Sequence, residues 1–548
     1  MSRFHGPGRS GGPGDAGGTG VNSRRGYRRW VWPAVLGVVA ATFSWGGPAG
    51  ADSSPGGLSE AIDTVLGDPR MEGGAASVVV ADAATGETLY QHNATGRLVP
   101  ASNTKLATST AAMELLGPDH RFTTDVLAGG RVRGGVLDGD LYLRGTGDPT
   151  TLAADYDKLA AEVAAAGVRK VDGRLVADDT RFDDRRQGDT WGADDESSYY
   201  AAQISALSVA PDTDYDTGTV IVEVVPGTKA GEKPAVRVTP ETDYVHFDVR
   251  ANTVAAGGEN SVTVERRHGT NTITVDGTVP VGGDTTKEWV TVWEPTGYAA
   301  AVFRDALAAH GVRVTGPTRP GRATPAGARR LASHDSMALK DLLVPFMKLS
   351  NNMHAEALTK AMGYKATGRP GSWDDGTAAI ASYLKGAGVD AGKVRQVDGS
   401  GLSRKNNFAA RQLADLLLSV RHAPWYADWY ASLPVACAPD RFVGGTLRSR
   451  MCGTPAALNA RGKTGSLTGA SALSGYVKDA DGRELVYSVV QNNYLAASVK
   501  PLEDAIVVTL AESTAEAATA VPPKSARSLP AAERDGDLEC SWRKPATC

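Results

Sequence analysis

The most constraining feature of the sequence is a change of pattern in its middle. From about 124 to 315, apolar and polar residues alternate in short runs separated by turn residues, as in Thr219 to Val225 and Asn271 to Val279. Alternation with a period of two is typical of half-buried β-strands. The segments on either side show helical spacing and hairpins instead. We therefore expect an inserted, mainly β region of two small domains, with the inner one at about 205–290.

The flanking segments, 52–123 and 316–520, have the pattern of one mixed domain. Helices are expected over 58–66, 102–116, 338–362 and 499–511, and a hairpin over 77–92. A further helix is expected over 298–310, near the end of the inserted region. A second hairpin is expected at Asp481-Gly482, because Asp-Gly favours the tight turns that join antiparallel strands. With 548 residues the chain exceeds what one hydrophobic core usually serves. The expected class is therefore α/β, with several domains.

The first 51 residues resemble an export signal. Arginines at 24–29 precede an apolar run from Trp30 to Trp45, and Ala49-Gly50-Ala51 supplies the small residues of a cleavage site. A retained membrane anchor is the alternative, but the run is short for a bilayer about 30 Å thick. We expect cleavage after Ala51, an exported mature protein and no stable membrane span. The export route, general or twin-arginine, is left open.

The four cysteines agree with an oxidising compartment. Cys437 and Cys452 flank one loop, whereas Cys540 and Cys548 lie in the expected C-terminal tail, 521–548. Of the three possible pairings we favour the two local ones, because their loops are shortest; free thiols are the alternative. No Cys/His cluster suggests a metal, and no cofactor is expected. A net charge of −4 is too small to imply a nucleic-acid partner.

The first chemical motif is Ser102-Asn-Thr-Lys105, which follows Pro100 at the expected start of a helix. A serine three residues before a lysine puts both side chains on one helix face, and the helix start favours an anion nearby. The motif is weak alone. Ser382–Lys385 and Ser541–Lys544 have the same spacing, and a helix cap with a solvated lysine explains any single case.

Two further motifs make the first one informative. Ser350-Asn351-Asn352 is the only Ser-x-Asn and lies between two helical stretches, where a turn with Asn352 as helix cap is the simpler interpretation. Lys463-Thr464-Gly465-Ser466 contains the only Lys-Thr-Gly and leads into the late hairpin, where an edge strand defended by lysine is the alternative. The order Ser-x-x-Lys, Ser-x-Asn, Lys-Thr-Gly is the signature of serine β-lactamases and penicillin-binding proteins.

With these motifs the chain resembles the class C low-molecular-mass penicillin-binding proteins, D-alanyl-D-alanine carboxypeptidase/endopeptidases, and most closely the actinomycete type. The resemblance extends to Gly145–Thr150, Asp178–Phe182, Gln203–Leu207, Asp398–Ser403, Ser432–Pro434 and Gly444–Leu447. It implies a penicillin-binding/β-lactamase-like transpeptidase domain, an antiparallel sheet flanked by helices, formed by 52–123 plus 316–520. It also implies two small domains between the first two motifs, where the residue pattern indicates the insertion.

Acyl transfer requires a nucleophile, a base, an oxyanion hole and a substrate anchor. We expect Ser102 to attack the carbonyl carbon between two terminal D-alanines. Lys105 can serve as base only if part of it is neutral near pH 7, which requires burial and a nearby positive charge. Lys463 is the expected source of that charge. Ser350 is expected to relay the proton to the leaving amine, and Asn352 to hold the amide on the acyl side.

The Lys-Thr-Gly segment is expected to bind the substrate. Lys463 should bind the terminal carboxylate with the hydroxyls of Thr464 and Ser466, while Gly465 completes the motif. The resemblance implies an oxyanion hole made by the backbone N–H groups of Ser102 and Ser466. Removing one such donor typically costs about a hundredfold or more in rate.

A second pocket is implied for the free-amine end of the stem peptide. In the resembled family an inserted domain contributes to it, and a carboxylate beside aromatic rings suits an ammonium. Asp195 and Tyr200 match best, with Gly192 where close relatives have tryptophan, and Leu467 should face the same pocket. A solvated acidic loop is the alternative.

The implied function is a carboxypeptidase/endopeptidase that trims or opens peptidoglycan stem peptides in the cell wall or outside the cell. β-Lactams are expected to act as covalent inhibitors, because they carry a strained amide and a carboxylate in matching places. Two alternatives are kept: a serine β-lactamase with fast deacylation, and a catalytically idle wall-binding protein.

Overall fold

The computed structural model describes residues 56–525 and Lys544. The expected export signal and the pair Cys540 and Cys548 lie outside these residues. Within them, no helix combines the length and the apolar character that crossing a membrane requires. The fold is a mixed α/β structure with several sheets, which confirms the predicted class.

A five-stranded antiparallel sheet, in the order β2-β1-β22-β21-β20, is formed by the parts of the chain that flank the insertion. Its strands are β1 (Ala75–Asp82), β2 (Thr88–His92), β20 (Arg461–Leu467), β21 (Ala470–Lys478) and β22 (Glu484–Asn492). Both hairpins expected from the sequence are confirmed. The sheet therefore joins the N-terminal strands to the Lys-Thr-Gly strand, β20, across the whole described chain.

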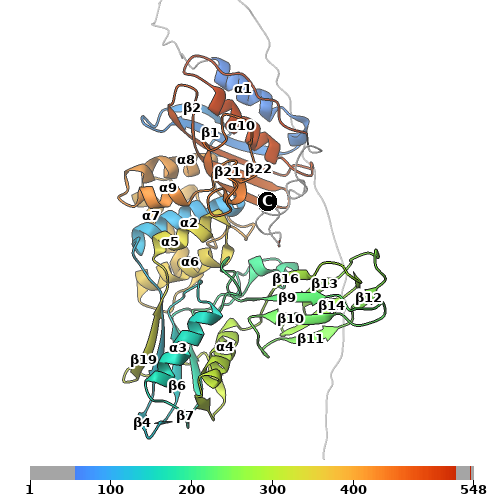
Figure 1. Cartoon of the computed structure of the whole chain (residues 1–548). Coiled ribbons are helices and arrows are strands. Elements are labelled where there is room, and N and C mark those ends of the chain that lie inside the picture. The colour runs from blue at the N-terminus through green and yellow to red at the C-terminus, as the bar shows by residue number, and fades with distance from the viewer. Residues whose placement is uncertain (1–55, 526–543, 545–548) are drawn as a thin grey trace, which may run out of the picture. The chain divides into compact units, whose positions relative to one another are not determined.

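Helices cover both faces of this sheet (Figure 1). One face carries α1 (Gly56–Leu66) and α10 (Lys500–Glu512); the other carries α8 (Ala410–Ser419) and α2 (Thr104–Leu115), backed by α5 (Leu339–Lys348), α6 (Asn352–Thr367), α7 (Trp373–Gly386) and α9 (Tyr426–Ser432). Val78 and Val80 of β1 belong to the apolar core between the sheet and helices α1 and α10. Val79 belongs to the core on the opposite face, with α2 and α8. Burial on both faces explains why this strand is a continuous apolar run.

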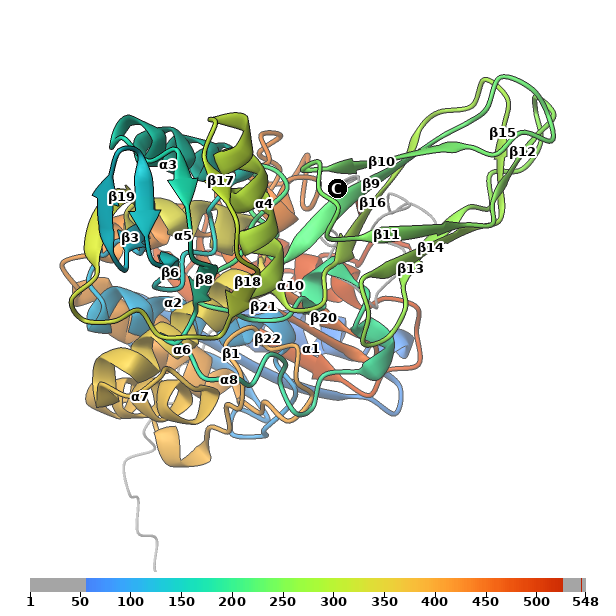
Figure 2. The ribbon, with the colours of Figure 1, turned by 90° about the horizontal axis from the view of Figure 1, so that it is seen from below.

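The outer part of the insertion consists of two sheets and two helices. One sheet has the order β18-β8-β6-β3-β19 and the other β17-β7-β5-β4. The elements are β3 (Thr123–Ala128), β4 (Arg131–Arg133), β5 (Val136–Asp138), β6 (Leu141–Gly145), α3 (Ala153–Ala165), β7 (Lys170–Val171), β8 (Leu175–Asp178), α4 (Pro295–Ala309), β17 (Arg313–Val314), β18 (Thr318–Pro320) and β19 (Arg329–Asp335). Helices α3 and α4 lie side by side against them (Figure 2).

The inner part is made of strands alone, in sheets β10-β9-β16, β11-β14-β13 and β12-β15. These strands are β9 (Thr219–Val225), β10 (Ala235–Thr239), β11 (His246–Val249), β12 (Asn252–Val254), β13 (Thr263–Arg266), β14 (Thr272–Asp276), β15 (Thr278–Pro280) and β16 (Thr286–Thr291). They form a separate group beside α4 in Figure 2. The alternating runs noted in the sequence, Thr219 to Val225 and Asn271 to Val279, correspond to β9 and to β14 with the start of β15.

The expected end of the insertion at 315 falls inside the outer sheet. Strands β18 and β19 follow that position, and β19 pairs with β3 while β18 pairs with β8. Neither strand shows a clear alternation, since β18 is Thr-Arg-Pro and β19 begins with two exposed arginines. Strands of this kind depend on their pairing partners, and the sequence pattern does not mark them.

A disulfide joins Cys437 to Cys452, as the shorter-loop argument predicts. The closed loop contains a short 3-10 helix, Gly445–Leu447, and Thr464 of the Lys-Thr-Gly strand donates a hydrogen bond to Thr446 in it, at 2.8 Å. The disulfide therefore restricts a loop that supports β20.

Replacing both Cys437 and Cys452 by serine should lower the free energy of unfolding. The bridge closes a loop with a sequence separation of 15, for which the loss of loop-closure entropy in the unfolded chain corresponds to about 3 kcal/mol. Urea unfolding of the oxidised parent and of the double variant measures the difference. Equal midpoints and slopes would contradict this role.

Candidate active site

Ser102 and Lys105 lie at the junction of a 3-10 turn, Ala101–Asn103, with α2. The Lys105 ammonium donates to Ser102 Oγ at 2.8 Å, and both side chains are buried. Ala101 has a left-handed φ of 47°, which is unfavourable for a residue with a Cβ atom. Such strain is typical of functional sites, and here it precedes the serine directly.

The Ser350–Asn352 turn faces this pair from the start of α6. Asn352 Oδ1 accepts a hydrogen bond from Lys105 Nζ at 2.7 Å, and Asn352 Nδ2 donates to Tyr200 O at 2.8 Å. The helix cap is Asn351, whose Oδ1 accepts from His354 N at 3.2 Å. The simpler interpretation of Asn352 as the cap is therefore wrong, because its neighbour caps the helix.

Lys463 reaches the site from β20. Its Nζ donates to Ser350 Oγ at 2.8 Å and to Thr464 O at 3.0 Å, and its carbonyl accepts from Asn103 Nδ2 at 2.9 Å. Two basic side chains from distant parts of the sequence thus meet one turn, since Lys105 binds Asn352 and Lys463 binds Ser350.

Gly465 allows β20 to lie directly against the serine turn. A Cβ atom at this position would lie 2.6 Å from Pro100 O and 2.9 Å from Ser102 N, closer than side chains tolerate. The next residue, Ser466, has a buried hydroxyl without a hydrogen-bond partner in the described part of the chain. An unsatisfied buried hydroxyl at this place suits a ligand oxygen.

Lys105 has a further partner that sequence reasoning missed. Its Nζ donates to the backbone carbonyl of Ser400 at 2.9 Å. Glu356, on the same helix as Asn352, fixes that backbone: its carboxylate accepts from Gly399 N and Ser400 N, both at 2.8 Å. Burial, with the charge of Asp398, raises the pKa of Glu356 to about 7. The only sequence signal was the 398–403 segment, which carried the family resemblance without a role.

The residues expected at the amine end also lie together. Tyr200 OH donates to Asp195 Oδ1 at 2.8 Å, and Tyr200 packs in a small apolar cluster that contains Leu467 and Tyr199. Burial is the main cause that raises the pKa of Tyr200 to about 12, so its hydroxyl stays a donor at neutral pH. This cluster adjoins the Asn352 amide through the Tyr200 carbonyl.

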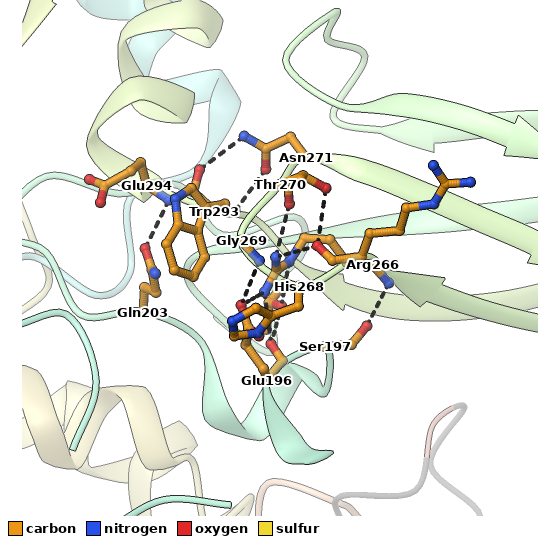
Figure 3. Close-up of polar contacts among 12 residues, drawn as sticks. Glu196, Ser197, Gln203, Arg266, His268, Gly269, Thr270, Asn271, Trp293 and Glu294 are labelled. Carbon is orange, nitrogen blue, oxygen red and sulfur yellow. Dashed lines mark hydrogen bonds and ion pairs between the residues drawn. The ribbon is translucent and has the colours of Figure 1, made fainter. Parts of the chain in front are cut away.

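The segment that carries Asp195 and Tyr200 is attached to the inner β part by Glu196 (Figure 3). The buried Arg266 guanidinium donates to Glu196 Oε1 at 2.8 Å, and His268 also contacts the carboxylate. Arg266 N donates to Ser197 Oγ at 2.8 Å. A buried ion pair holds its geometry because breaking it leaves an uncompensated charge. The inner strands therefore position the segment beside the site.

Glu356→Gln should lower the rate of acylation by a penicillin and change its pH dependence. Three N–H groups, from Trp373 Nε1, Gly399 and Ser400, point at the carboxylate. As the pH falls through about 7, Glu356 takes up a proton and places an O–H among these donors, so the Ser400 carbonyl is held less well. Stopped-flow acylation from pH 5 to 8 measures this. The acylation rate of the parent should fall toward acid pH, and this fall should be absent in the variant. If the rate of Glu356→Gln falls in the same way, the titrating group is another one.

Comparisons with known proteins agree with this arrangement. The chain matches the model of the D-Ala-D-Ala carboxypeptidase 3 (S13) family over residues 58–513. It is 45% identical over 532 residues to a D-alanyl-D-alanine carboxypeptidase of Actinomadura sp. (strain R39), covering 95% of this chain and 97% of the relative. It is 27% identical over 415 residues to D-alanyl-D-alanine carboxypeptidase DacB of Haemophilus influenzae, covering 74% and 83%.

A solved structure is also similar. The crystal structure of penicillin binding protein 4 from Haemophilus influenzae aligns with a TM-score of 0.71 and 26% sequence identity, covering 80% of this chain and 94% of that one. The similarity therefore extends over the insertion as well as the flanking segments.

Proposed function

Because the chain belongs to the D-Ala-D-Ala carboxypeptidase 3 (S13) family, we propose that Ser102 is its acylated nucleophile and Lys105 the base. The chain is a serine-type D-Ala-D-Ala carboxypeptidase, a hydrolase. The observation that carries the assignment of residues is the 2.8 Å hydrogen bond between Lys105 Nζ and Ser102 Oγ. Nucleophile and base within hydrogen-bond distance are the geometric requirement for covalent acyl transfer.

Acylation begins when Ser102 Oγ attacks the carbonyl carbon between the last two D-alanines and its proton passes to the neutral amine form of Lys105. The negative oxygen that forms is stabilised by the backbone N–H groups of Ser102 and Ser466. The C–N bond then breaks, and Ser350 relays the proton from Lys105 to the leaving amine, so that Ser350 keeps its own hydroxyl proton and Lys105 is neutral again. Release of D-alanine leaves the peptide as an ester on Ser102, and water cleaves that ester to restore the hydroxyl.

Lys463 binds the terminal carboxylate of the peptide, with Thr464 and Ser466 supplying hydroxyl donors. The unsatisfied, buried Ser466 Oγ supports this role, because it provides a donor that no described residue occupies. Asn352 holds the amide on the acyl side. Its own amide is oriented by Lys105 and by the Tyr200 carbonyl, which limits its rotation.

The substrate is a peptidoglycan stem peptide, bound with its free-amine end at Asp195 and Tyr200 beside Leu467. A carboxylate next to an aromatic ring attracts an ammonium. The same acyl-enzyme forms from a crosslinked peptide, which gives endopeptidase action. This substrate requires the mature protein to act outside the cell membrane, in agreement with the signal inferred for residues 1–51.

Ser102→Ala should abolish covalent labelling by a fluorescent penicillin, since the variant lacks the attacking oxygen. Ser382→Ala is the matched control, because Ser382 has the same spacing to a lysine but lies exposed on α7. Labelling is read on a denaturing gel. A label that persists in Ser102→Ala, or disappears in Ser382→Ala, would sink the assignment.

Lys463→Ala should lower kcat/KM for a peptide that ends in free D-Ala-D-Ala by about thirtyfold or more, the effect of losing one partner of a buried charge pair. The same peptide with an amidated C-terminus should show little further loss, because it has no carboxylate for Lys463 to bind. Equal losses for both peptides would contradict the anchor. Lys463→Arg provides the comparison that keeps the charge.

The decay of the penicillin adduct separates this function from that of a β-lactamase. A stable adduct over many minutes is expected for a carboxypeptidase, whereas rapid turnover with regained activity would favour the β-lactamase. Mass spectrometry of the intact protein at successive times measures it. Release of D-alanine from a stem-peptide mimic excludes an idle wall-binding protein.

A further inference from the structure

Lys544, near the C-terminus, lies in an acidic pocket beside the catalytic cleft. Its ammonium donates to Asp214 Oδ2 at 3.0 Å and also contacts Asp216. Two aromatic faces complete the surroundings: the ring centroids of Tyr199 and Trp289 lie 4.8 and 5.0 Å from Nζ. Carboxylates together with aromatic rings are the groups that bind an alkylammonium. We call Tyr199, Asp214, Asp216 and Trp289 the ammonium pocket.

The pocket is a constructed site rather than a chance surface contact. The side chain of Lys544 is only 5% exposed, and those of Asp214 and Asp216 are 11% and 9% exposed. Arg441 holds Asp214 with two hydrogen bonds of 2.6 and 2.8 Å. Trp289 is held in turn, because its Nε1 donates to Asp212 Oδ2 at 3.0 Å. The Asp214 carboxylate and the Trp289 ring are therefore both fixed by hydrogen bonds to other side chains.

The electrostatics favour a charged occupant. Burial acts to lower the pKa of Lys544, but the charges of Asp216 and Asp214 outweigh it, so the pKa is raised. Asp216 in contrast has its pKa raised to about 6 by burial, despite the adjacent ammonium. With Lys544 in place, its ammonium is the main counter-charge of the buried Asp216 carboxylate.

The ammonium pocket is hydrogen-bonded to the Ser-x-Asn turn. Asn351 Nδ2 donates to Asp216 Oδ1 at 3.1 Å and to Tyr215 O at 3.1 Å. Asn351 lies between Ser350 and Asn352 and caps α6. One carboxylate, that of Asp216, is therefore shared by the terminal lysine and the centre of the catalytic turn. This set differs from Asp195, Tyr200 and Leu467, the residues assigned to the free-amine end of the substrate.

We propose that the ammonium pocket is the docking site of the Lys544 side chain, and that this docking supports the Ser350–Asn352 turn. The contact path runs from Lys544 to Asp216, from Asp216 to Asn351, and from there to the two side chains that bind Lys463 and Lys105. Lys544 is a positioning residue, because it touches none of the reacting groups. Its effect on acylation rests on the proposed function, whereas its binding to the pocket does not.

The test uses the full chain with Lys544→Ala and n-butylammonium as the probe. The variant should acylate with a fluorescent penicillin more slowly, by roughly fivefold, within the range seen when linked sites are coupled. Saturating n-butylammonium should restore most of the rate, because its alkyl chain and ammonium reproduce the missing lysine side chain. Lys544→Arg keeps the charge and should stay near the parent rate.

Two controls isolate the pocket. n-Butanol has a similar apolar chain without the charge and should restore nothing. Lys340→Ala removes a partly exposed lysine that pairs with Asp119 at 2.8 Å, and it should neither slow acylation nor respond to the amine. An unchanged rate in Lys544→Ala, or equal recovery with n-butanol, would overturn the proposal.

Binding is measured separately by thermal unfolding, which does not require an active serine. n-Butylammonium should raise the Tm of Lys544→Ala in a saturable manner and leave the parent unchanged, since its pocket is filled. A parent that is stabilised equally would mean that another cation occupies the pocket and that Lys544 does not. If Ser102→Ala abolishes labelling while the amine still stabilises Lys544→Ala, the nucleophile and the docking site are both supported; if labelling persists in Ser102→Ala, the failure concerns the nucleophile alone.

Discussion

The buried ammonium of Lys105 is the interaction on which the site depends. It binds oxygens of Ser102, Asn352 and Ser400, which come from three separate segments of the chain. A charge that is fully removed from water must be matched by well-oriented partners, because the loss of solvation is large. The same requirement that keeps the lysine satisfied brings Ser102, the Ser-x-Asn turn and the 398–403 segment together.

Much of this could be predicted from the sequence, because short motifs in a fixed order specify both chemistry and local structure. The Ser-x-x-Lys helix, the Ser-x-Asn turn and the Lys-Thr-Gly strand all occur where their spacing indicated. Glu356 and Thr446 could not be found in this way. Their roles arise from backbone groups and hydroxyls that meet only after folding, and one carboxylate or one threonine among many gives no pattern.

The alternating pattern predicted strands in the middle of the chain, but the expected boundary at 315 separates β18 and β19 from the sheet to which they belong. Inner strands such as β13 and β14 alternate in burial because each has a core face and a solvent face. Strands β18 and β19 close the outer sheet with little apolar content, so their pairing comes from tertiary context. The sequence assigned no contact to the C-terminal tail, 521–548, yet Lys544 is buried against Asp214 and Asp216. Ion pairs between distant segments produce no periodic pattern in the amino-acid sequence, so the sequence does not predict them.

The disulfide between Cys437 and Cys452 makes the conformation of one loop depend on the redox conditions around the protein. Thiols stay reduced inside the cell and pair outside it, and the bridged loop contains Thr446, the hydrogen-bond partner of Thr464. Without the bridge, only non-covalent contacts hold that loop, so the hydrogen bond between Thr446 and Thr464 is less well fixed. The oxidation state of this cysteine pair is thereby coupled to the order of β20, the strand that carries Lys463.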